Sequence, residues 1–474
     1  MKIAGVDNPV RVDWFYDQGF RLDAKPYLSG SLAARKRIES LPGTVTLGSV
    51  TAGHGGGIFK GPMFRRVYLT DPAHSVPFLG SKDMMAADLT NLPRLRKSDA
   101  VSRNLAYLRL KPGMTLISRS GFYAGRRSYV RPDMGDVWAS DDVLRVEPSP
   151  ERIRSGYLYA FLVSRFGEAL VRGTVYGSAV KHIEPHHLTG LPVPRFADAL
   201  EERVHQLVEE SARLRAAFQS GLERATEDLF RSVGLPELVN YRWHQESPDL
   251  GFEVADFGVQ SIRALNFAPR ARRIVGKLSS VEHRTLGEIC EGGLLSRGVR
   301  FKRVDSEAEF GAKLVGQRQA FWIRPEGRML ASGSLPAEVF ADDETIMVAS
   351  QGTLGEQEVF CRAFLATGSW LGNAYSEHFL RIKSGDEGVS GAYLFAFLRS
   401  EIAFRVFRSM SAGGKQQDIH EGLRRKVPVP LASPADRERI AETVRQAYRD
   451  RDQADLLEDE ALVLLTAAVE GAES

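Results

Sequence analysis

The chain has 474 residues, 43% hydrophobic and 26% charged, a composition that excludes an intrinsically disordered protein. No apolar run reaches the roughly 18 residues that span a bilayer, and the stretch from Met1 to Phe15 lacks the apolar core of a signal peptide. The two cysteines, Cys290 and Cys361, have neither metal-binding nor disulfide spacing. We therefore expect a cytoplasmic protein with no membrane partner, whose formal net charge of +3 permits a polyanionic partner without requiring one.

The first half of the chain alternates short strands with turns and ends in a long helix. Strands are predicted at Met114–Ser120 and Asp142–Pro148, where apolar runs are bounded by Gly, Asp and Pro. The apolar stretch "SGYLYAFLVS" from Ser155 predicts a buried helix that packs on this sheet. After "LPVP", the proline-free segment from Ala197 to Phe230 predicts a helix of about 50 Å, at 1.5 Å per residue.

The second half repeats this order. Strands are predicted at Thr345–Gln351 and His378–Ser384, a buried helix in "YLFAFLRS" from Tyr393, and a second long helix from Pro434 to Glu470. Tyr157 and Tyr393 are 236 positions apart, and the same offset joins Leu144-Arg145 to Leu380-Arg381 and Pro192-Val193-Pro194 to Pro428-Val429-Pro430. We interpret the chain as two copies of one unit of about 236 residues, which is too long for a solenoid repeat and fits a domain with its connector.

Both long helices have apolar residues at alternating steps of three and four, which is the spacing of a coiled-coil seam. Ser211 fills a gap in the first row, and Arg451 interrupts the second. Dense Glu and Arg on either side favour two helices that bury each other over helices that each lie on their own domain. The predicted seam residues are Leu200, Val204, Leu207, Leu214 and Phe218 in the first helix, and Ile440, Val444, Ala447, Ala454, Leu457, Ala461 and Leu464 in the second.

The order of these segments resembles the specificity subunit of type I restriction-modification enzymes. A glycine turn ("SGFYAG", "QGTLG") is followed by "DDVLRVEP" or "EHFLRIKS", then by "YLYAFLVS" or "YLFAFLRS", then by "GSAVKHI" or "GGKQQDI", then by "LPVP" or "VPVP" and a long helix. The stretches Phe20–Tyr27 and Val76–Met84 are also similar to phrases of that family. No single motif is specific, but their order and duplication extend over most of the chain.

This resemblance implies an α/β (α+β) fold with two duplicated target-recognition domains, residues 1–195 and 233–432. The two spacer helices, residues 196–232 and 433–474, would form an antiparallel coiled coil. It further implies a non-catalytic subunit that reads a bipartite, asymmetric site in double-stranded DNA. This subunit would dock methyltransferase subunits, of which we expect two, and a restriction/translocase subunit. S-adenosylmethionine, magnesium and ATP would bind to those partners. Helices of about 50 Å are long enough to separate domains on half-sites that lie about 34 to 36 Å apart per turn of DNA.

The residues expected to contact DNA are basic, amide or hydroxyl side chains in glycine-containing turns and basic stretches, where they would bind phosphates or base edges. Solvated loops with no DNA contact are the alternative. Arg131 lies in the same predicted loop as Arg119, Arg126 and Arg127. The basic stretches are Phe59–Val67, Arg94–Arg103, Arg270–Lys277 and Arg297–Arg303. The candidates are Lys60, Arg65, Arg119, Ser120, Tyr123, Arg126, Arg127, Lys181 and His182 in the first copy, and Arg300, Lys302, Gln351, Thr353, Lys415, Gln416 and Gln417 in the second.

Signals of a self-contained enzyme are weak. The chain has no Asn-Pro-Pro-Tyr or Asp-Pro-Pro-Tyr sequence of an amino-methyltransferase, and the glycine-rich Gly53–Gly61 lacks the Gly-Lys-Ser/Thr ending of a phosphate loop. Asp23 and Lys25 have nuclease-like spacing without an upstream acidic motif. His182, His186 and His187 could suggest zinc, but the 236-residue offset replaces them with Asp418, Gly422 and Leu423. We expect no catalytic residue, no metal and no cofactor in this chain.

Two other readings of the resemblance stay open. The chain could be a specificity-like DNA-binding subunit of another methyltransferase-linked phage-defence system. It could also be a scaffold that has lost DNA reading, although the many Arg and Gln residues in its loops weigh against this.

Overall fold

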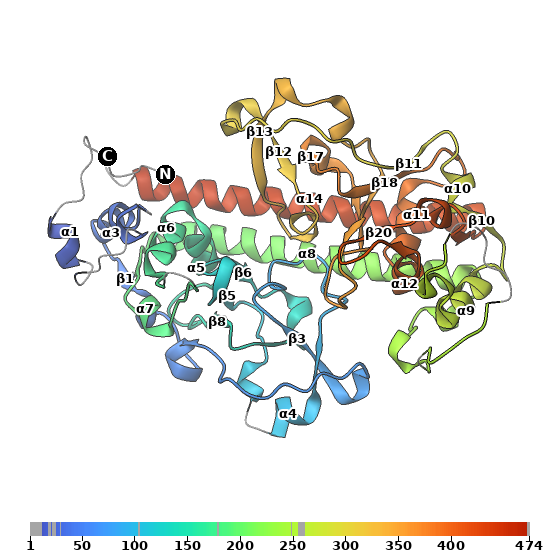
Figure 1. The fold of residues 1–474 in the computed structure, drawn as a ribbon. Coiled ribbons are helices and arrows are strands. Elements are labelled where there is room, and N and C mark those ends of the chain that lie inside the picture. Colours follow the sequence, from blue (N-terminus) through green and yellow to red (C-terminus); the bar gives the residue numbers. More distant parts are fainter. Residues whose placement is uncertain are drawn as a thin grey trace. The chain divides into compact units, whose positions relative to one another are not determined.

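The computed structural model describes residues 12–17, 20, 25–28, 30–102, 105–177, 180–247, 249–254 and 261–471. It divides into two compact units (Figure 1): unit 1 contains Met1–Ala86, Leu92–Ala216 and Gln453–Ser474, and unit 2 contains Ala87–Asn91 and Ala217–Asp452. Each unit therefore includes half of each of two long helices, α8 (Asp198–Ser232) and α14 (Pro434–Gly471). The predicted domain limits, which set both helices apart from the recognition domains, remain a prediction.

Unit 1 is built on small sheets that are antiparallel except for the parallel pair β3 and β7, with helices against them. One sheet has the strand order β2-β8-β5-β6, a second has β4-β3-β7, and β1 pairs with β9. The bounds are α1 Val12–Asp17, α2 Lys25–Leu28, α3 Ser31–Glu39, β1 Val45–Thr46, β2 Ile58–Phe59, β3 Ser75–Leu79, β4 Arg94–Arg96, α4 Lys97–Ser102, β5 Thr115–Ser118, β6 Arg127–Tyr129, β7 Trp138–Ala139, β8 Val143–Val146, α5 Ser155–Val163, α6 Arg165–Thr174, α7 Pro185–Thr189 and β9 Pro192–Val193.

Unit 2 has the same sheets in the same order. Its strands run β11-β18-β14-β16, β13-β12-β17 and β10-β21, with a further sheet β15-β20-β19. The bounds are α9 Pro269–Leu278, β10 His283–Thr285, α10 Leu286–Ile289, β11 Leu294–Arg297, β12 Gly311–Val315, β13 Gly327–Ala331, β14 Thr345–Ala349, β15 Gln351–Gly352, β16 Ala363–Ala366, β17 Ala374–Tyr375, β18 Phe379–Lys383, α11 Gly391–Leu398, α12 Glu401–Ser409, β19 Ser411–Ala412, β20 Gln417–Ile419, α13 Glu421–Arg424 and β21 Pro428–Pro430.

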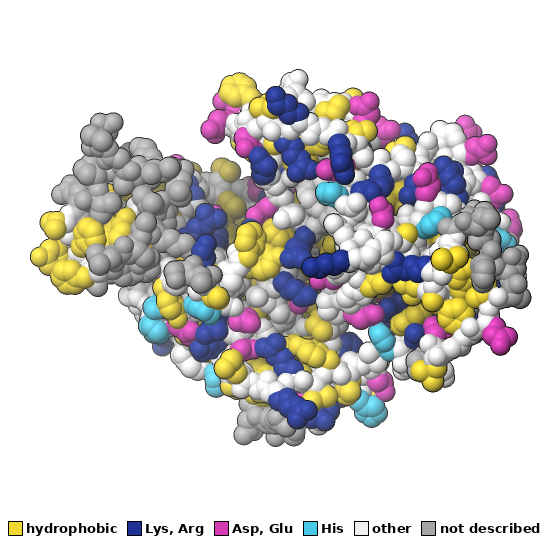
Figure 2. All heavy atoms as spheres, viewed as in Figure 1, with side chains coloured by type: hydrophobic (Ala, Val, Ile, Leu, Met, Phe, Trp, Pro, Cys, Tyr) yellow, Lys and Arg dark blue, Asp and Glu magenta, His cyan; other side chains and the backbone are white. Residues whose placement is uncertain are grey.

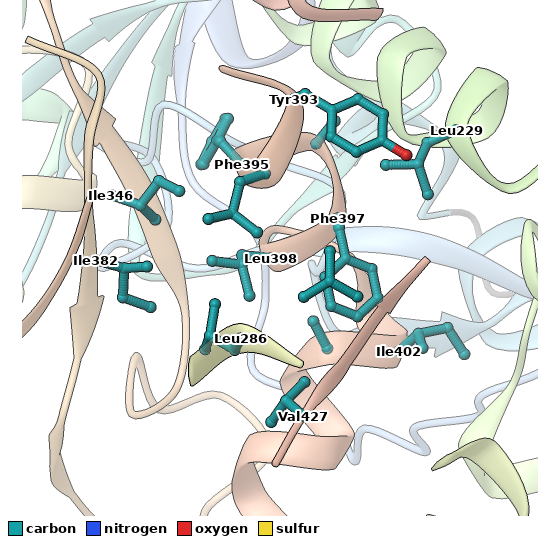
Figure 3. Packing of buried hydrophobic residues seen from close by; sticks show 14 of the residues in the cluster. Leu229, Leu286, Ile346, Ile382, Tyr393, Phe395, Phe397, Leu398, Ile402 and Val427 are labelled. Atoms are coloured by element: carbon teal, nitrogen blue, oxygen red, sulfur yellow. The ribbon is translucent and has the colours of Figure 1, made fainter. Parts of the chain in front are cut away.

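The apolar helices α5 and α11 form the centres of the two cores. Both are apolar around their whole circumference, so they are stable only when surrounded by protein. In unit 2, Phe395, Phe397 and Leu398 of α11 pack with strand residues and with Leu229 of α8 (Figure 3). The helices are also anchored alike, because the Tyr157 hydroxyl donates to Pro194 O at 2.6 Å and the Tyr393 hydroxyl donates to Pro430 O at 2.9 Å.

The arginine that both copies place in the central sheet is buried. Arg145 of β8 is 1% exposed and donates to the carbonyls of Ala139, Ser140 and Val143. Arg381 of β18 is 4% exposed and donates to the carbonyls of Glu338, Val339, Phe340 and Tyr375. These side chains donate to backbone carbonyls at the ends of strands and in the adjoining connections, where buried carbonyls need hydrogen-bond donors.

The halves of α8 and α14 run antiparallel within each unit. In unit 1, the Ser211 hydroxyl donates to Ala454 O at 2.8 Å, and Arg203 pairs with Glu460 at 2.6 Å. In unit 2, the Phe218 and Tyr448 rings meet edge to face at 5.3 Å, and a Cβ built on Gly221 would lie 3.0 Å from the Ala447 Cβ. The close approach at Gly221 requires the small residue.

The buried row of α14 includes charged residues, which differs from the predicted row. Leu457 and Leu464 are only half-buried at the edge of the unit 1 core, whereas Glu458 and Leu465 are buried. Arg451, expected to break the row, is 3% exposed, and its guanidinium lies 4.2 Å from the centre of the Trp370 ring. Charged side chains take buried positions here because they have partners.

Within the described residues, no helix combines the length and apolar character needed to cross a membrane. Cys290 and Cys361 are buried free thiols.

Candidate nucleic-acid interface

In unit 1, the turn after β5 and the segment 181–184 lie side by side at one end of the central sheet. Ser120 forms a β-bridge with His182, Gly121 N donates to Lys181 O at 2.9 Å, and Ile183 N donates to Arg119 O at 2.9 Å. Lys60 follows β2 in the same sheet. The fold therefore brings candidates from three parts of the sequence to one place.

Acidic residues hold several of these candidates. Glu184 accepts from Arg119 Nη2 at 2.6 Å and from Lys60 Nζ at 2.7 Å, and Asp142 accepts from the Ser120 hydroxyl at 2.7 Å. Burial opposes ionisation of Glu184, but the hydrogen bonds from Lys60 and Arg119 outweigh it and lower the pKa of that carboxyl. The Arg119 side chain is only 18% exposed. It therefore holds neighbouring groups in place and does not extend into solvent.

Strand register places the corresponding residues of unit 2. Ile58 and Leu295 occupy matching positions in β2 and β11, and Ser118 and Ala349 match in β5 and β14. The equivalent pairs that follow are Lys60 and Arg297, Ser120 and Gln351, Asp142 and His378, and His182 and Asp418. The backbone frame is shared, and the polar groups on it differ.

Solved type I restriction-modification S subunits are similar to this chain. The S subunit from M. genitalium is 13% identical, with a TM-score of 0.30, over 90% of this chain and 95% of that one. The HsdS subunit from Thermoanaerobacter tengcongensis is 13% identical, with a TM-score of 0.27, over 91% and 98%. A structure concerned with complex assembly and conformational transition of the type I R-M system is 15% identical, with a TM-score of 0.26, over 91% and 98%. No protein-family model and no curated protein matches the chain.

The polar network of unit 2 is closed around Gln351. In the orientation that satisfies both groups, the Gln351 amide donates to His378 Nδ1 at 2.5 Å and accepts from Arg297 Nη2 at 2.6 Å. Arg297 Nη1 also donates to Asp418 Oδ2 at 2.5 Å. The Gln351 amide, a predicted DNA contact, and the Arg297 guanidinium are therefore both engaged within the protein.

Two predicted contact residues point inward. Arg127 has a side chain that is 10% exposed, donates to Gly125 O at 2.6 Å, and has its pKa lowered by burial. Gln417 is 7% exposed and donates to Gly414 O. Each of these side chains bonds to the backbone of its own turn and so stabilises it. Other residues of the two turns face the solvent. Arg131, in the same cluster, is 2% exposed and paired with Asp133 at 2.8 Å.

The remaining candidates are accessible. Tyr123, Arg126 and His182 are half-buried, and the exposed ones are Arg65, Lys181, Arg300, Lys302, Thr353, Lys415 and Gln416. Exposed lysine and arginine side chains suit phosphate contacts. In Figure 2, Lys and Arg side chains gather in small groups with acidic side chains between them. Residual positive charge is thus local, in agreement with the low net charge.

The basic stretch of α9 is largely neutralised by neighbouring acids. Arg270 pairs with Asp249 at 3.0 Å, Arg273 with Glu246 at 2.8 Å, and Lys277 with Glu237 at 3.4 Å. A run of basic residues in the sequence does not by itself show a basic surface.

The sequence analysis missed the acidic and histidine residues that orient the site, and it missed Phe122. The phenyl ring of Phe122 is 80% exposed on the turn after β5. Comparing the two copies position by position would have singled out Asp142 and His378, because a polar residue of different type stands at the same place in each copy.

Among the residues that the structure describes, no three His, Cys, Asp or Glu side chains are arranged to hold a metal ion. The His186 and His187 rings contact each other at 4.1 Å. Asp23 lies outside the described residues.

Proposed function

We propose that this chain is the DNA sequence-specificity subunit of a type I restriction-modification complex, in which each unit reads one half of a bipartite, asymmetric site. The observation that supports this most is the pair of matched sheets with different polar side chains at equivalent positions. A duplicated frame with diverged contact groups is suited to reading two different half-sites.

The differences are chemically large. Lys60 carries a single ammonium where Arg297 carries a planar guanidinium, and the two groups donate hydrogen bonds in different geometries. His182 is replaced by Asp418, which accepts hydrogen bonds and attracts amino groups such as that of cytosine. Because donor and acceptor patterns distinguish bases in the major groove, we expect the two half-sites to differ in sequence.

The helix pair would serve as spacer and as docking site for methyltransferase subunits. In unit 2, α8 and α14 form a shallow groove of about 430 Å³ with a floor of small residues and a charged rim, lined by Ala217, Gly221, Arg224, Arg439, Glu442, Thr443, Gln446, Ala447 and Asp450. Small residues on the floor let another helix approach closely, and the charged rim can select its register. In this proposal catalysis, S-adenosylmethionine, magnesium and ATP belong to partner subunits.

The test is the methylome of the host strain with and without this gene, read by single-molecule sequencing. We expect a split, asymmetric methylated sequence that disappears with the gene and returns when the gene is restored. An intact methyltransferase gene in both strains is the control. A methylome that is unchanged while that methyltransferase is expressed would contradict the proposal.

A further inference from the structure

The turn after β5 presents Phe122 on a rigid backbone. Gly125 N donates to Ser118 O at 2.8 Å, Ala124 N donates to Gly121 O at 3.2 Å, and Arg126 N donates to Tyr123 O at 2.9 Å. Gly121 has φ 71°, a conformation that favours glycine and turns the chain outward just before Phe122. With these bonds made, the ring cannot move into the core without breaking the turn.

Exposure of this ring is unusual for its residue type. Phenylalanine is among the residues most often buried, yet this side chain is 80% exposed, and its ring lies perpendicular to that of Tyr123 with the centroids 5.4 Å apart. Gly121, the residue before it, donates to the backbone carbonyl of Lys181, whose side chain is exposed. An isolated exposed apolar residue on an arbitrary surface needs no explanation, but this one stands at the tip of the candidate interface.

The equivalent turn of unit 2 differs at this position. Gly121-Phe122 matches Gly352-Thr353, and Thr353 is exposed. That turn is held by α12, because Arg408 donates to Leu354 O at 2.6 Å and to Gly355 O at 2.8 Å, and Arg405 pairs with Glu356 at 2.7 Å. Both copies therefore hold the turn in place, with an exposed Phe122 in unit 1 and an exposed Thr353 at the matching position in unit 2.

We propose that Phe122 is a specificity-determining residue of unit 1, which inserts its ring against a base step of the half-site. This inference rests on the proposed function and deepens it. An aromatic ring wedged into a base step unstacks it, and pyrimidine-purine steps unstack most readily. The half-site read by unit 1 would then contain such a step, whereas unit 2 would read through hydrogen bonds.

The experiment uses the full chain and duplexes that contain the methylated sequence, with 2-aminopurine placed at each half-site position in turn. We expect wild-type protein to raise the fluorescence at one step of one half-site. Phe122→Ala should abolish that rise and weaken binding about tenfold, and Phe122→Trp should retain both. Because the side chain is exposed, the thermal unfolding midpoint of Phe122→Ala should equal that of the wild type.

Phe310→Ala is the matched control, because Phe310 is 67% exposed and immediately precedes β12, in a different sheet from the turn that contains Thr353. It should leave the fluorescence signal unchanged. This inference alone would be overturned if the wild-type protein binds the methylated sequence and Phe122→Ala matches it in both affinity and fluorescence. Wild-type protein that does not prefer the sequence to a scrambled duplex would overturn the proposed function and this inference with it.

Discussion

Glu356, in the turn of unit 2, is ionised over an unusually wide pH range. Burial disfavours its charge, but the hydrogen bonds and positive charge of Arg405 outweigh burial and lower the pKa of Glu356 to about 2. An unfolded glutamate has a pKa of about 4.3, so the ion pair stabilises the folded state fully above that value. The stabilisation is lost as pH falls toward 2.

We predict that Glu356→Gln lowers the free energy of unfolding at pH 7 by about 1 kcal/mol or less, since nearly half of the Glu356 side chain is in contact with water. The difference from wild type should shrink below about pH 4 and disappear near pH 2. Urea unfolding across this range measures it, with the exposed Glu309→Gln as control. A difference that is independent of pH would contradict the assignment.

Arg145 shows how a charged side chain can stabilise a core. Burial lowers its pKa to about 10, so it is still protonated at neutral pH. Arg145→Met should lower the free energy of unfolding of unit 1 by about 3 kcal/mol, because buried carbonyls lose their donors at about 1 to 3 kcal/mol each. Arg109→Met, at a position with a side chain 53% exposed, should cost less than about 1 kcal/mol. Thermal unfolding of the two variants measures the difference. Equal losses of stability in Arg145→Met and Arg109→Met would show that Arg145 is dispensable.

At the scale of elements, the helix pair of unit 1 contains a buried ion pair. Arg215 Nη2 lies 2.5 Å from Glu458 Oε2 and 2.9 Å from Asp455 Oδ1, and the Tyr159 hydroxyl donates to Glu458 at 2.7 Å. Burial opposes the charge of Arg215, but the attraction of Glu458 and Asp455 outweighs it and raises the pKa of Arg215.

We predict that Glu458→Leu destabilises unit 1 by about 3 kcal/mol, because it leaves Arg215 buried with a weaker counter-charge. The double variant Arg215→Met, Glu458→Leu should recover most of that loss, since an apolar pair of similar volume packs at this position. A double-mutant cycle from urea unfolding gives the coupling free energy. Additive single effects would show that the pair is not coupled.

The two helices illustrate which features local sequence can predict. The segment predicted as helical, Ala197–Phe230, agrees closely with α8, because proline-free amphipathic patterns are local signals. In α14 the predicted row contains Leu457, which packs against the unit 1 core, whereas its more deeply buried neighbour Glu458 was not predicted, because hydrophobicity alone favours leucine. The partner that makes Glu458 suitable for burial is Arg215, 243 positions earlier. The same holds for Arg119, whose partner Glu184 lies far away in the sequence and is brought near only by folding. Local sequence could not predict this ion pair.

At the scale of the whole molecule, the two turns should be exchangeable. Residues 119–126 and 350–362 follow equivalent positions of β5 and β14, and they precede the equivalent residues Arg127 of β6 and Ala363 of β16. Each segment can therefore be joined in register to the strands of the other unit. We predict that replacing 119–126 with 350–362 changes one half of the methylated sequence and leaves the other half as in wild type. Single-molecule methylome sequencing of cells with the chimera measures this. Alteration of both halves would contradict the assignment of one half-site to each unit.

Residues Ala87–Asn91 precede most of unit 1 in the sequence but belong to unit 2, where Asp88 pairs with Arg399 at 2.8 Å and Gln219 donates to Asp88 and Thr90. Recombination that replaced residues 1–195 as one gene cassette would also replace Asp88. A donor cassette without an acid at this position would leave Arg399, 7% exposed, without its counter-charge. Under the proposed function, an exchange of the first half of the chain for that of a relative is thus constrained by a segment of five residues.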